Sequence, residues 1–451
     1  MSLDSDRSSS SADDLSPTPV ANDEATTDTT DDVDSADTAE APVREGTARD
    51  VLAIRDFRRL FIASFLSNAG RWMQQVVLGV FAWELTASST FLGLVIFAQM
   101  FPMLLLSIVG GSLADTVDRR RLLLGTQAWQ AVWGVVLAWQ IWDDEIGRTS
   151  LLILVFVIGV GQALYAPAFT AVLPSLVGRE NLSAAISLNS AQVNGSRVIG
   201  PAIGAWLASQ YGFSEVMLIN AATYLFVIGA LLVVTIPAVR SKPASMGDRY
   251  FGGFRIARRS RQVGLPLVTM ATFAALCLPF IGQMPALAEL NLGVDPDSTA
   301  YGLLYACFGV GALVGAISVG TALAQVPKPL VVRATLALFA VSLAVLSLLR
   351  TEEPAFVAIF FVGLFYFTMP VALSTFLQQH LADEVRGRVM SLWTLAFGGV
   401  ISISNFAMGA IVDATSVTTV IFAGAVVAGL LAVFVRLEPG DVVGEELLGR
   451  D

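Results

Sequence analysis

Long apolar stretches recur along almost the whole chain, and each is long enough to cross a bilayer. A transmembrane helix needs about 20 mostly apolar residues. Because lipid offers the backbone no hydrogen-bond partners, such stretches predict α-helices. Twelve of them are present, so we expect an all-α membrane protein. The predicted spans are 60–83, 90–112, 122–142, 150–173, 184–208, 214–236, 264–288, 299–322, 331–349, 355–376, 388–411 and 416–436.

The composition also favours a membrane protein, because 55% of the residues are hydrophobic and only 14% are charged. The two cysteines, Cys277 and Cys307, lie in apolar runs without a CxxC spacing, and His380 is the single histidine. This argues against a disulfide framework, a metal site and a nucleophile–histidine pair. The sequence also lacks a glycine-rich loop ending in Lys-Ser/Thr. We therefore expect no enzyme, no catalytic or metal-binding residue, no cofactor and no nucleic-acid partner.

The two ends of the chain are acidic and polar. Residues 1–50 are rich in Ser, Thr, Asp and Glu and lack an apolar core for a signal peptide. Such a segment buries too little apolar surface to fold, so we expect a disordered cytoplasmic tail. It would act as a regulatory or partner-binding tail, or be acidic only as an adaptation to high salt. Residues 438–451 are expected to form a second, short acidic tail.

Basic residues follow the predicted topology. Connections after the odd-numbered spans contain almost none, with Arg148 and Arg350 as exceptions. Connections after the even-numbered spans carry Arg119–Arg121, Arg179, the 240–261 loop, Lys328, Arg386 and Arg388. Short basic loops mark the cytoplasmic side, so we expect a multi-pass protein of the cell membrane with both termini in the cytoplasm.

The longest connection divides the predicted spans into two sets of six. We expect a bundle over 51–239, a basic cytoplasmic linker over 240–262 and a second bundle over 263–437. The linker serves as a tether and topology signal, with attraction to anionic lipid as a further use. A shift of 204 residues places 173–188 on 377–392, which indicates that the two halves are related. Such parallel halves are typical of transporters that rock around a central site.

A short basic stretch between the second and third spans reads Gly-Gly-Ser-Leu-Ala-Asp-Thr-Val-Asp-Arg-Arg-Arg over 110–121. A carboxylate at the mouth of such a loop can pair with an arginine. The stretch resembles the signature loop of the major facilitator superfamily, in its enterobactin-exporter-like branch of drug and siderophore efflux proteins. The resemblance implies that Asp115 helps to latch the two halves together on the cytoplasmic side, and Asp115 with Arg119 and Arg120 would gate that side. The matching positions include Gly111, Leu113, Ala114, Asp115, Arg119, Arg120 and Leu123, whereas Thr116 and Asp118 depart from the pattern.

A second motif lies in the fifth span. Gly200 and Gly204 share a helical face and allow close backbone contact, and Pro201 can kink the helix. The segment Gly195–Gly204 resembles the Gly-Pro motif of the superfamily's antiporters. The resemblance implies efflux, whereas small-residue packing alone is the structural alternative.

Two arginines fall inside predicted spans, Arg71 in the first and Arg197 in the fifth. An intramembrane charge is costly, so each is expected to face a cavity or a partner. Both would line one cavity and attract an anionic group of the substrate, or each would make a structural contact. Carboxylates that could couple transport to protons are scarce at mid-membrane, and Glu289 is the best candidate of a weak set.

Amide and aromatic side chains recur in the spans that would surround a cavity. Together they suit a bulky organic molecule, although hydrogen bonds between helices are an equally common use of such residues. The candidates for substrate or coupling contacts are Gln75, Gln162, Tyr165 and Asn194, accompanied by Asn68, Trp72, Gln99, Gln127, Asn189, Gln192, Gln283, Tyr366 and Asn405.

Together these features predict a monomeric secondary transporter that exports a small organic molecule, drug-like or siderophore-like. It would work by alternating access, driven by an ion gradient, with a proton or another ion as coupling partner. Uptake or lipid transport is one alternative. A membrane sensor or scaffold that has lost transport is the other, and it would depend on the acidic tail.

Overall fold

The computed structural model describes residues 47–116, 118–178, 180–236, 246–438 and 443–444. Over 107–116, 246–252 and at residue 383 it describes the backbone alone. All of these residues belong to one compact unit, 44–451. This part of the chain is helical, and its only β pairing is an isolated bridge between Leu381 and Val443. The rest of the two predicted tails lies outside the described residues.

The first helix, α1 (Ala48–Ala53), begins inside the range predicted to be a disordered tail. Thr47 and Asp50 form a capping box, in which Asp50 N donates to Thr47 Oγ1 at 3.4 Å and Thr47 N donates to Asp50 Oδ2 at 2.8 Å. These two bonds satisfy amide groups that the first turn leaves free. The prediction of a disordered tail was therefore wrong for residues 48–50.

Six long helices form the first half. They are α2 (Arg55–Thr86), α3 (Ser89–Thr116), α4 (Arg119–Trp142), α5 (Arg148–Val177), α6 (Leu182–Tyr211) and α7 (Phe213–Val233). Each contains one of the first six predicted spans, apart from the last three residues of 214–236.

The second half has the same number of passes, but two of them are interrupted. The seventh consists of α9 (Arg261–Leu276), a 3₁₀ turn (Pro279–Gln283), α10 (Met284–Leu287) and a π-helical turn, η2 (Ala288–Leu292). The eleventh consists of α14 (Asp383–Thr394), a π-helical turn, η3 (Leu395–Gly399), and α15 (Val400–Ala414). The uninterrupted passes are α11 (Thr299–Gly320), α12 (Lys328–Leu348), α13 (Glu352–Gln379) and α16 (Val417–Phe434).

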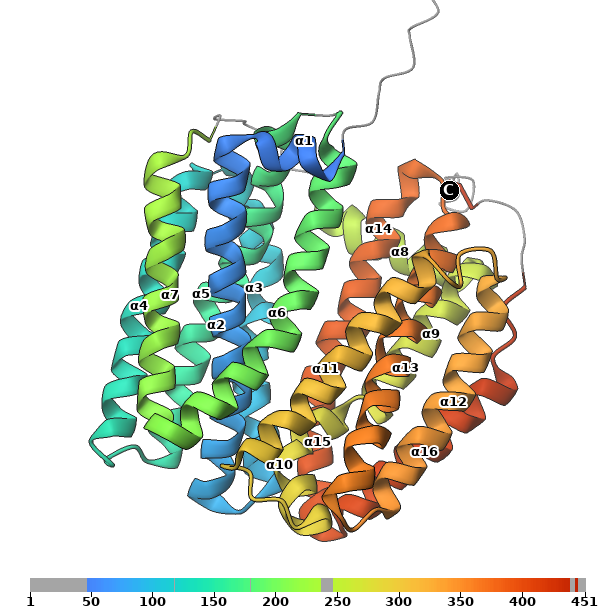
Figure 1. Cartoon of the computed structure of the whole chain (residues 1–451). Helices are drawn as coiled ribbons and strands as arrows, with labels where there is room; N and C mark the ends of the chain where they lie inside the picture. Colours follow the sequence, from blue (N-terminus) through green and yellow to red (C-terminus); the bar gives the residue numbers. More distant parts are fainter. Residues whose placement is uncertain (1–46, 117, 179, 237–245, 439–442, 445–451) are drawn as a thin grey trace, which may run out of the picture. The chain divides into compact units, whose positions relative to one another are not determined.

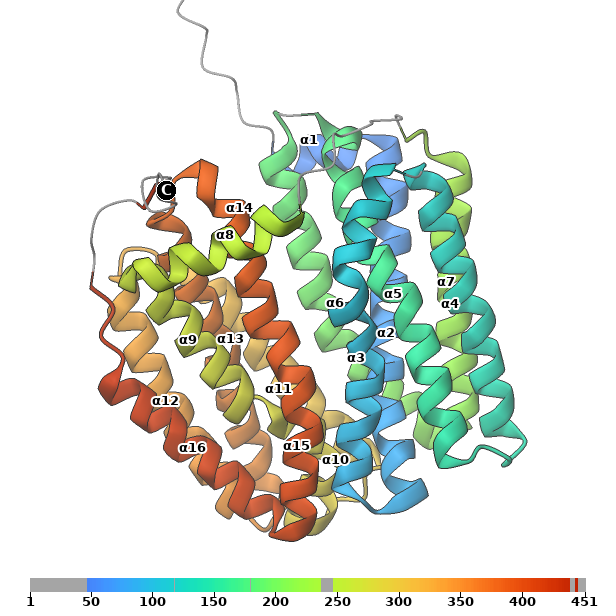
Figure 2. The same cartoon turned by 180° about the vertical axis from the view of Figure 1, so that it is seen from behind.

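Ten helical segments of the described chain are long and apolar enough to cross a membrane. The other two long helices of the first half, α2 and α6, have 32 and 30 residues but are more polar than these ten segments. They carry the intramembrane arginines Arg71 and Arg197 together with several amides. The polarity of α6 fits its place beside the other half in Figures 1 and 2, where it faces α11, and α2 packs against α6.

The packing repeats from one half to the other. In the first half α3 packs along α5 and α4 along α7, and in the second α11 packs along α13 and α12 along α16. Two of the corresponding starts, Arg148 with Glu352 and Phe213 with Val417, are 204 residues apart. Across the boundary, α3 packs on α15 and α6 packs on α11. These two contacts between the halves are called the α3–α15 seam and the α6–α11 seam from here on.

Part of the predicted linker is a helix, α8 (Met246–Arg259), which the sequence analysis missed. It packs on α14, with Ile256 fully buried in a cluster that includes Val385. A Cβ at Gly253 would lie 2.6 Å from the carbonyl oxygen of Arg388, so only glycine allows this contact. Figures 1 and 2 show α1 and α8 at the same end, which we call the α1 end, and α10 toward the opposite end, the α10 end.

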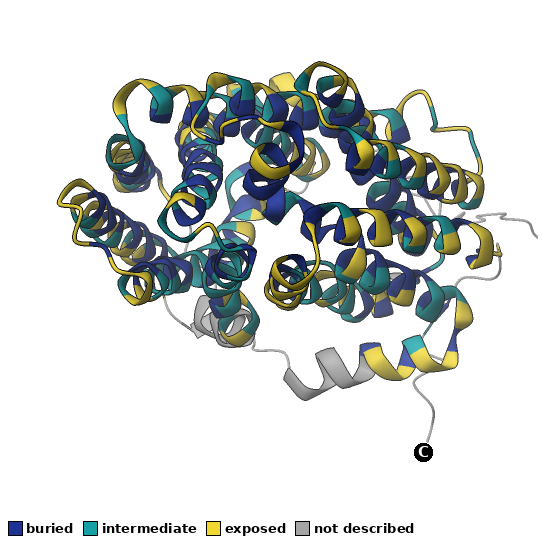
Figure 3. Cartoon of the chain, turned by 90° about the horizontal axis from the view of Figure 1, so that it is seen from below, coloured by how far each residue is buried: buried dark blue, intermediate teal, exposed yellow. Residues whose placement is uncertain are grey.

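The outward faces of the helices are apolar. Figure 3 shows buried surfaces turned toward neighbouring helices and exposed surfaces turned away from them. Large exposed side chains include Trp139, Phe226 and Phe434, the last with 74% of its surface exposed. An apolar exterior of this kind is stable in lipid rather than in water.

Close packing of α11 on α13 provides a stability prediction. A Cβ at Gly363 would lie closer to Phe308 O than real Cβ atoms come, and 2.9 Å from Phe308 C. Gly363→Ala should therefore destabilise the second half by about 1–3 kcal/mol, through overpacking against backbone that cannot move aside. Thermal unfolding of the purified protein in detergent would measure the loss. Gly229→Ala is the matched control, since nothing lies within 4 Å of its Cβ position. Equal melting temperatures for the two variants would contradict the prediction.

Candidate transport cavity

A cavity lies between the two halves. Its lining comes from α2, α3 and α6 on one side and from α11, α13, α15 and the turns beside them on the other. About 1160 Å³ of space lies between its lining atoms, part of it open to solvent. Side chains that offer polar or aromatic contacts to this space are Trp72, Gln75, Gln99, Arg197, Tyr305, Phe308, Tyr366, Phe367, Phe397 and Asn405.

Arg197 joins the two halves across this cavity. Its guanidinium carbon lies 4.9 Å from the ring centre of Trp72 on α2 and 4.9 Å from that of Phe367 on α13. A cation over an aromatic face at this distance is attracted by the ring's quadrupole, and more strongly where water is excluded. Arg197 Nε is buried and has no hydrogen-bond partner among the described residues. Two aromatic rings thus lie against the guanidinium, while at least one of its donors remains unused.

The glycines of α6 create the close contact that places Arg197 over Trp72. A Cβ at Gly200 would lie 2.5 Å from Ala69 O and 2.8 Å from Trp72 Cβ, and one at Gly204 would lie 2.6 Å from Met73 Cγ. The predicted close approach is present, and its partner is α2 of the same half. Pro201 lines the cavity without ending α6.

Arg71 is placed differently, and the prediction that both arginines line one cavity is not met among the described lining residues. Arg71 Nη2 donates to Asn68 Oδ1 at 3.4 Å, and its guanidinium carbon lies 5.3 Å from the Trp72 ring centre. The polar pair Asn220–Gln74 is buried in the same half, where Asn220 donates to Gln74 Oε1. Arg71 thus makes contacts within the first half.

The other predicted substrate contacts divide in the same way. Gln75 lines the cavity, whereas Gln162, Tyr165 and Asn194 are not among its described lining residues. Tyr165 stacks on Phe169, with ring centres 5.5 Å apart. Asn194 Nδ2 donates to the carbonyl oxygen of Ser190 on its own helix at 2.9 Å. Gln162 lies half-buried on α5.

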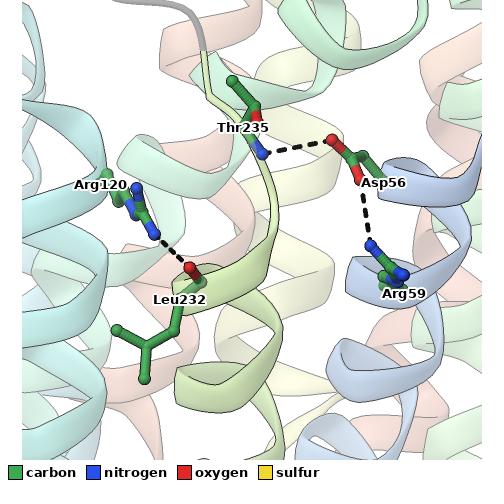
Figure 4. Close-up of polar contacts among 5 residues, drawn as sticks. All are labelled: Asp56, Arg59, Arg120, Leu232 and Thr235. Carbon is green, nitrogen blue, oxygen red and sulfur yellow. Dashed lines mark hydrogen bonds and ion pairs between the residues drawn. The ribbon is translucent and has the colours of Figure 1, made fainter.

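The signature loop lies at the α1 end. Gly111 and Asp115 belong to α3, but their side chains lie outside the described residues. Arg119 donates to Ala171 O at 3.0 Å. Arg120 donates to Leu231 O at 2.8 Å and to Leu232 O at 2.5 Å, as Figure 4 shows for Leu232. Arg120 therefore binds the carboxyl end of α7 in its own half, where the helix dipole favours a cation.

At the α10 end, one carboxylate joins the halves. Asp413 on α15 accepts hydrogen bonds from Ser88 Oγ, Ser89 N, Thr90 N and Thr90 Oγ1, at 2.6–2.9 Å. Asp413 therefore caps the amino end of α3 from the other half. A carboxylate in this position satisfies free amides and interacts favourably with the helix dipole. Hereafter this group of contacts is called the Asp413 cap.

Glu289 takes part in the same closure. It lies on η2 and accepts a hydrogen bond from Trp83 Nε1 on α2. Gln283 Nε2 donates to Ser89 O at 3.4 Å, which adds a second contact between the halves. Glu289 was predicted as a candidate for substrate or coupling contacts, and the structure places it in contact with Trp83 rather than among the described lining residues.

Glycines bring the helices of both seams together. On the α3–α15 seam a Cβ at Gly409 would approach Ser89 O too closely and would lie 2.8 Å from Ser89 C. On the α6–α11 seam a Cβ at Gly302 would lie 2.6 Å from Ala205 Cβ, and one at Gly309 would lie 2.9 Å from Val198 Cα. In this structure the halves are thus closed against each other at the α10 end.

Some contributors to the site escaped the sequence analysis. Tyr305 and Phe308, three residues apart on α11, and Phe367 on α13 line the cavity. The spacing of Tyr305 and Phe308 puts them on one helical face and was an available signal. The pairing of Phe367 with Arg197 had no local signal, because the two residues are 170 positions apart.

The cavity is suited to binding rather than to catalysis. Arg197 is the one charged side chain among its described lining residues, and the others offer amide, hydroxyl, aromatic and aliphatic groups. Asn405 Oδ1 and Trp72 Nε1 are buried without a hydrogen-bond partner in the described part of the chain. Buried polar atoms of this kind are uncommon, and they offer an acceptor and a donor to a ligand.

Comparison with known proteins adds a family and relatives. A family model described as transmembrane secretion effector matches residues 47–445. The staphyloferrin A transporter of Staphylococcus aureus is 25% identical over 340 residues, which cover 74% of this chain and 83% of the relative. The enterobactin exporter EntS of Shigella boydii is 25% identical over 346 residues, covering 75% and 80%.

Solved structures share the fold at low identity. The nucleoside transporter NupG aligns with a TM-score of 0.68 and 12% identity, covering 83% of this chain and 97% of that chain. A bacterial homologue of the iron transporter ferroportin, in an inward-facing state, aligns with a TM-score of 0.64 and 16% identity, covering 84% and 98%.

Proposed function

Because the chain belongs to the transmembrane secretion effector family of the major facilitator superfamily, it is a membrane transporter, and we propose that it exports a small organic molecule from the cytoplasm. Binding in the cavity and alternating access across the cell membrane would carry the cargo outward, driven by an electrochemical ion gradient. Both relatives described above are named for siderophores, and one is named an exporter. This supports a drug-like or siderophore-like cargo.

The observation that carries the proposal is the cavity at the boundary of the halves. Residues of both halves line the cavity, so rocking of one half against the other would change the contacts of a bound molecule. The Asp413 cap and the α3–α15 seam close the α10 end, which we assign to the outside because the basic loops lie at the α1 end. Both termini would then be cytoplasmic.

Asp115 keeps its proposed role as a latch at the α1 end. Closing that end would expose the cavity to the outside, and Asp115 would bind the second half in that state. Asp115→Asn should then slow export by about tenfold, because a charge-assisted hydrogen bond contributes roughly 1.5–3 kcal/mol.

The test is accumulation of a panel of dyes, drugs and siderophores in cells that express wild type or Asp115→Asn at matched levels. Lower accumulation in wild type alone, lost when an uncoupler is added, is the expected result. Lower accumulation that persists in Asp115→Asn would contradict the latch. Higher accumulation in wild type than in cells without the protein would show uptake and contradict export.

A further inference from the structure

The charge of the cavity is unbalanced. Among its described lining residues Arg197 carries the only charge, and aromatic rings rather than carboxylates lie against its guanidinium. A buried cation without an opposite charge is costly in a membrane. A site that keeps such a cation is suited to a ligand that supplies the missing negative charge.

The shape of the cavity around Arg197 adds a second property of the ligand. The rings of Trp72 and Phe367 take up space on two sides of the Arg197 side chain's end without using its hydrogen-bond donors, which stay available to an anionic group. Arg197 Nε and Trp72 Nε1 are both buried and unpartnered in the described part of the chain. Tyr305, Phe308 and Tyr366 supply ring surfaces nearby. Together they fit a planar or aromatic body that carries an acidic group.

We propose that the cargo is an organic anion whose charge pairs with Arg197, and that its charge makes export electrogenic and driven by the membrane potential. This rests on the export function proposed above. No described residue lining the cavity is Asp, Glu or His, so the charge of the cavity stays positive over the physiological range. When a monoanion is bound, Arg197 and the cargo together are neutral during the outward step. After release, the empty protein returns to the inward-facing state with the positive charge of Arg197 alone.

The membrane potential favours this direction of transport. With the cytoplasm negative, an anion moves outward down the electrical gradient. At 100 mV each negative charge allows an equilibrium concentration ratio of about 50-fold. Export of an anion therefore needs no proton-binding carboxylate in the cavity.

The test uses protein reconstituted into liposomes and two probes with the same ring and opposite charge, naphthalenesulfonate and naphthyltrimethylammonium. Potassium gradients with valinomycin set the potential at equal pH, and a second series sets a pH gradient at zero potential. Protein-free liposomes give the background. We expect naphthalenesulfonate at a positive interior to enter about tenfold or more faster than the cation enters at a negative interior of the same magnitude, so that each probe has the same driving force. The pH gradient alone should have no effect on the anion.

Variants of Arg197 test whether its positive charge causes the preference for the anion. Arg197→Gln should abolish the preference for the anion, and Arg197→Lys should retain it. Arg350→Gln is the matched control, since Arg350 donates to Ser347 O at the α10 end and does not belong to the described cavity lining. It should keep the preference.

The outcomes distinguish the two proposals. Entry of the cation but not the anion would overturn the inference and leave transport standing. Entry of the anion that follows the pH gradient rather than the potential would also overturn it. Entry of neither probe would contradict both the inference and the proposed export.

Discussion

Gly409→Val is expected to abolish transport while leaving each half folded. A side chain at this position would enter the backbone of Ser89, which belongs to the other half, so the clash arises only when the α10 end is closed. Overpacking costs about 1–3 kcal/mol, which shifts the ratio of closed to open states by roughly five- to 150-fold. The variant should therefore remain open at the α10 end and fail to complete the transport cycle.

Thiol labelling would measure this shift. Cys277 and Cys307 would be replaced by serine, and Gln75→Cys would place a single thiol in the cavity. A membrane-impermeant reagent added outside should label that thiol at least several-fold faster in Gly409→Val than in its parent. Gly229→Val is the matched control, because its Cβ position has no neighbour within 4 Å. Unchanged labelling together with normal transport would refute the role of this seam.

Asp413→Ala should have a smaller effect in the same assay. It removes four hydrogen bonds to the amino end of α3 but adds no obstacle to closing. An N-cap typically contributes about 1 kcal/mol, so labelling should rise about fivefold. The labelling rate should therefore be highest in Gly409→Val, lower in Asp413→Ala and lowest in wild type. This order is expected if close packing contributes more to the closed seam than hydrogen bonds do.

Arg197→Gln is expected to reduce transport without loss of stability, whereas Arg71→Gln should change transport little. Arg197 belongs to the cavity lining and Arg71 does not, although both lie against Trp72. Arg197→Gln should reduce transport about tenfold or more, since it removes a charge that would bind cargo. Its melting temperature should stay level or rise, because an unpaired buried charge is removed.

Arg71→Gln should keep most of its transport activity. Its amide can still reach toward Asn68, the partner of Arg71 at 3.4 Å. Transport rates and thermal unfolding of both variants at matched expression would be compared with wild type. Equal loss of transport in the two would contradict the distinction between a cavity arginine and an arginine of the helix bundle.

Much of the architecture was predictable because lipid imposes a simple rule on the backbone. Each predicted apolar span coincides with a helical segment over nearly all of its length, and the repeat of 204 residues reappears in the starts of α5 and α13. The glycines of α6 were also predictable, because Gly200 and Gly204 must share a face in any helix. These features depend on residues close together in sequence.

The remaining features depend on distant pairs. The contact of Phe367 with Arg197 and that of Asp413 with Ser89 join different halves. Neither contact could be predicted from a pattern of neighbouring residues in the sequence. The linker helix α8 was missed because its basic residues suggested a loop, whereas packing on α14 stabilises it. Arg71 and Arg197 are expected at similar depth from the sequence, but in the structure Arg197 lines the cavity and Arg71 binds Asn68.

The Asp413 cap makes the two seams of the repeat unequal. The repeat places Ser209 of α6 opposite Asp413, and Ser209 Oγ donates to Trp206 O within its own helix at 2.9 Å. One seam thus carries a polar clasp, and at the corresponding place the other relies on small residues such as Gly302. The two seams related by the repeat therefore differ in kind, because a carboxylate fastens one of them and small side chains pack the other.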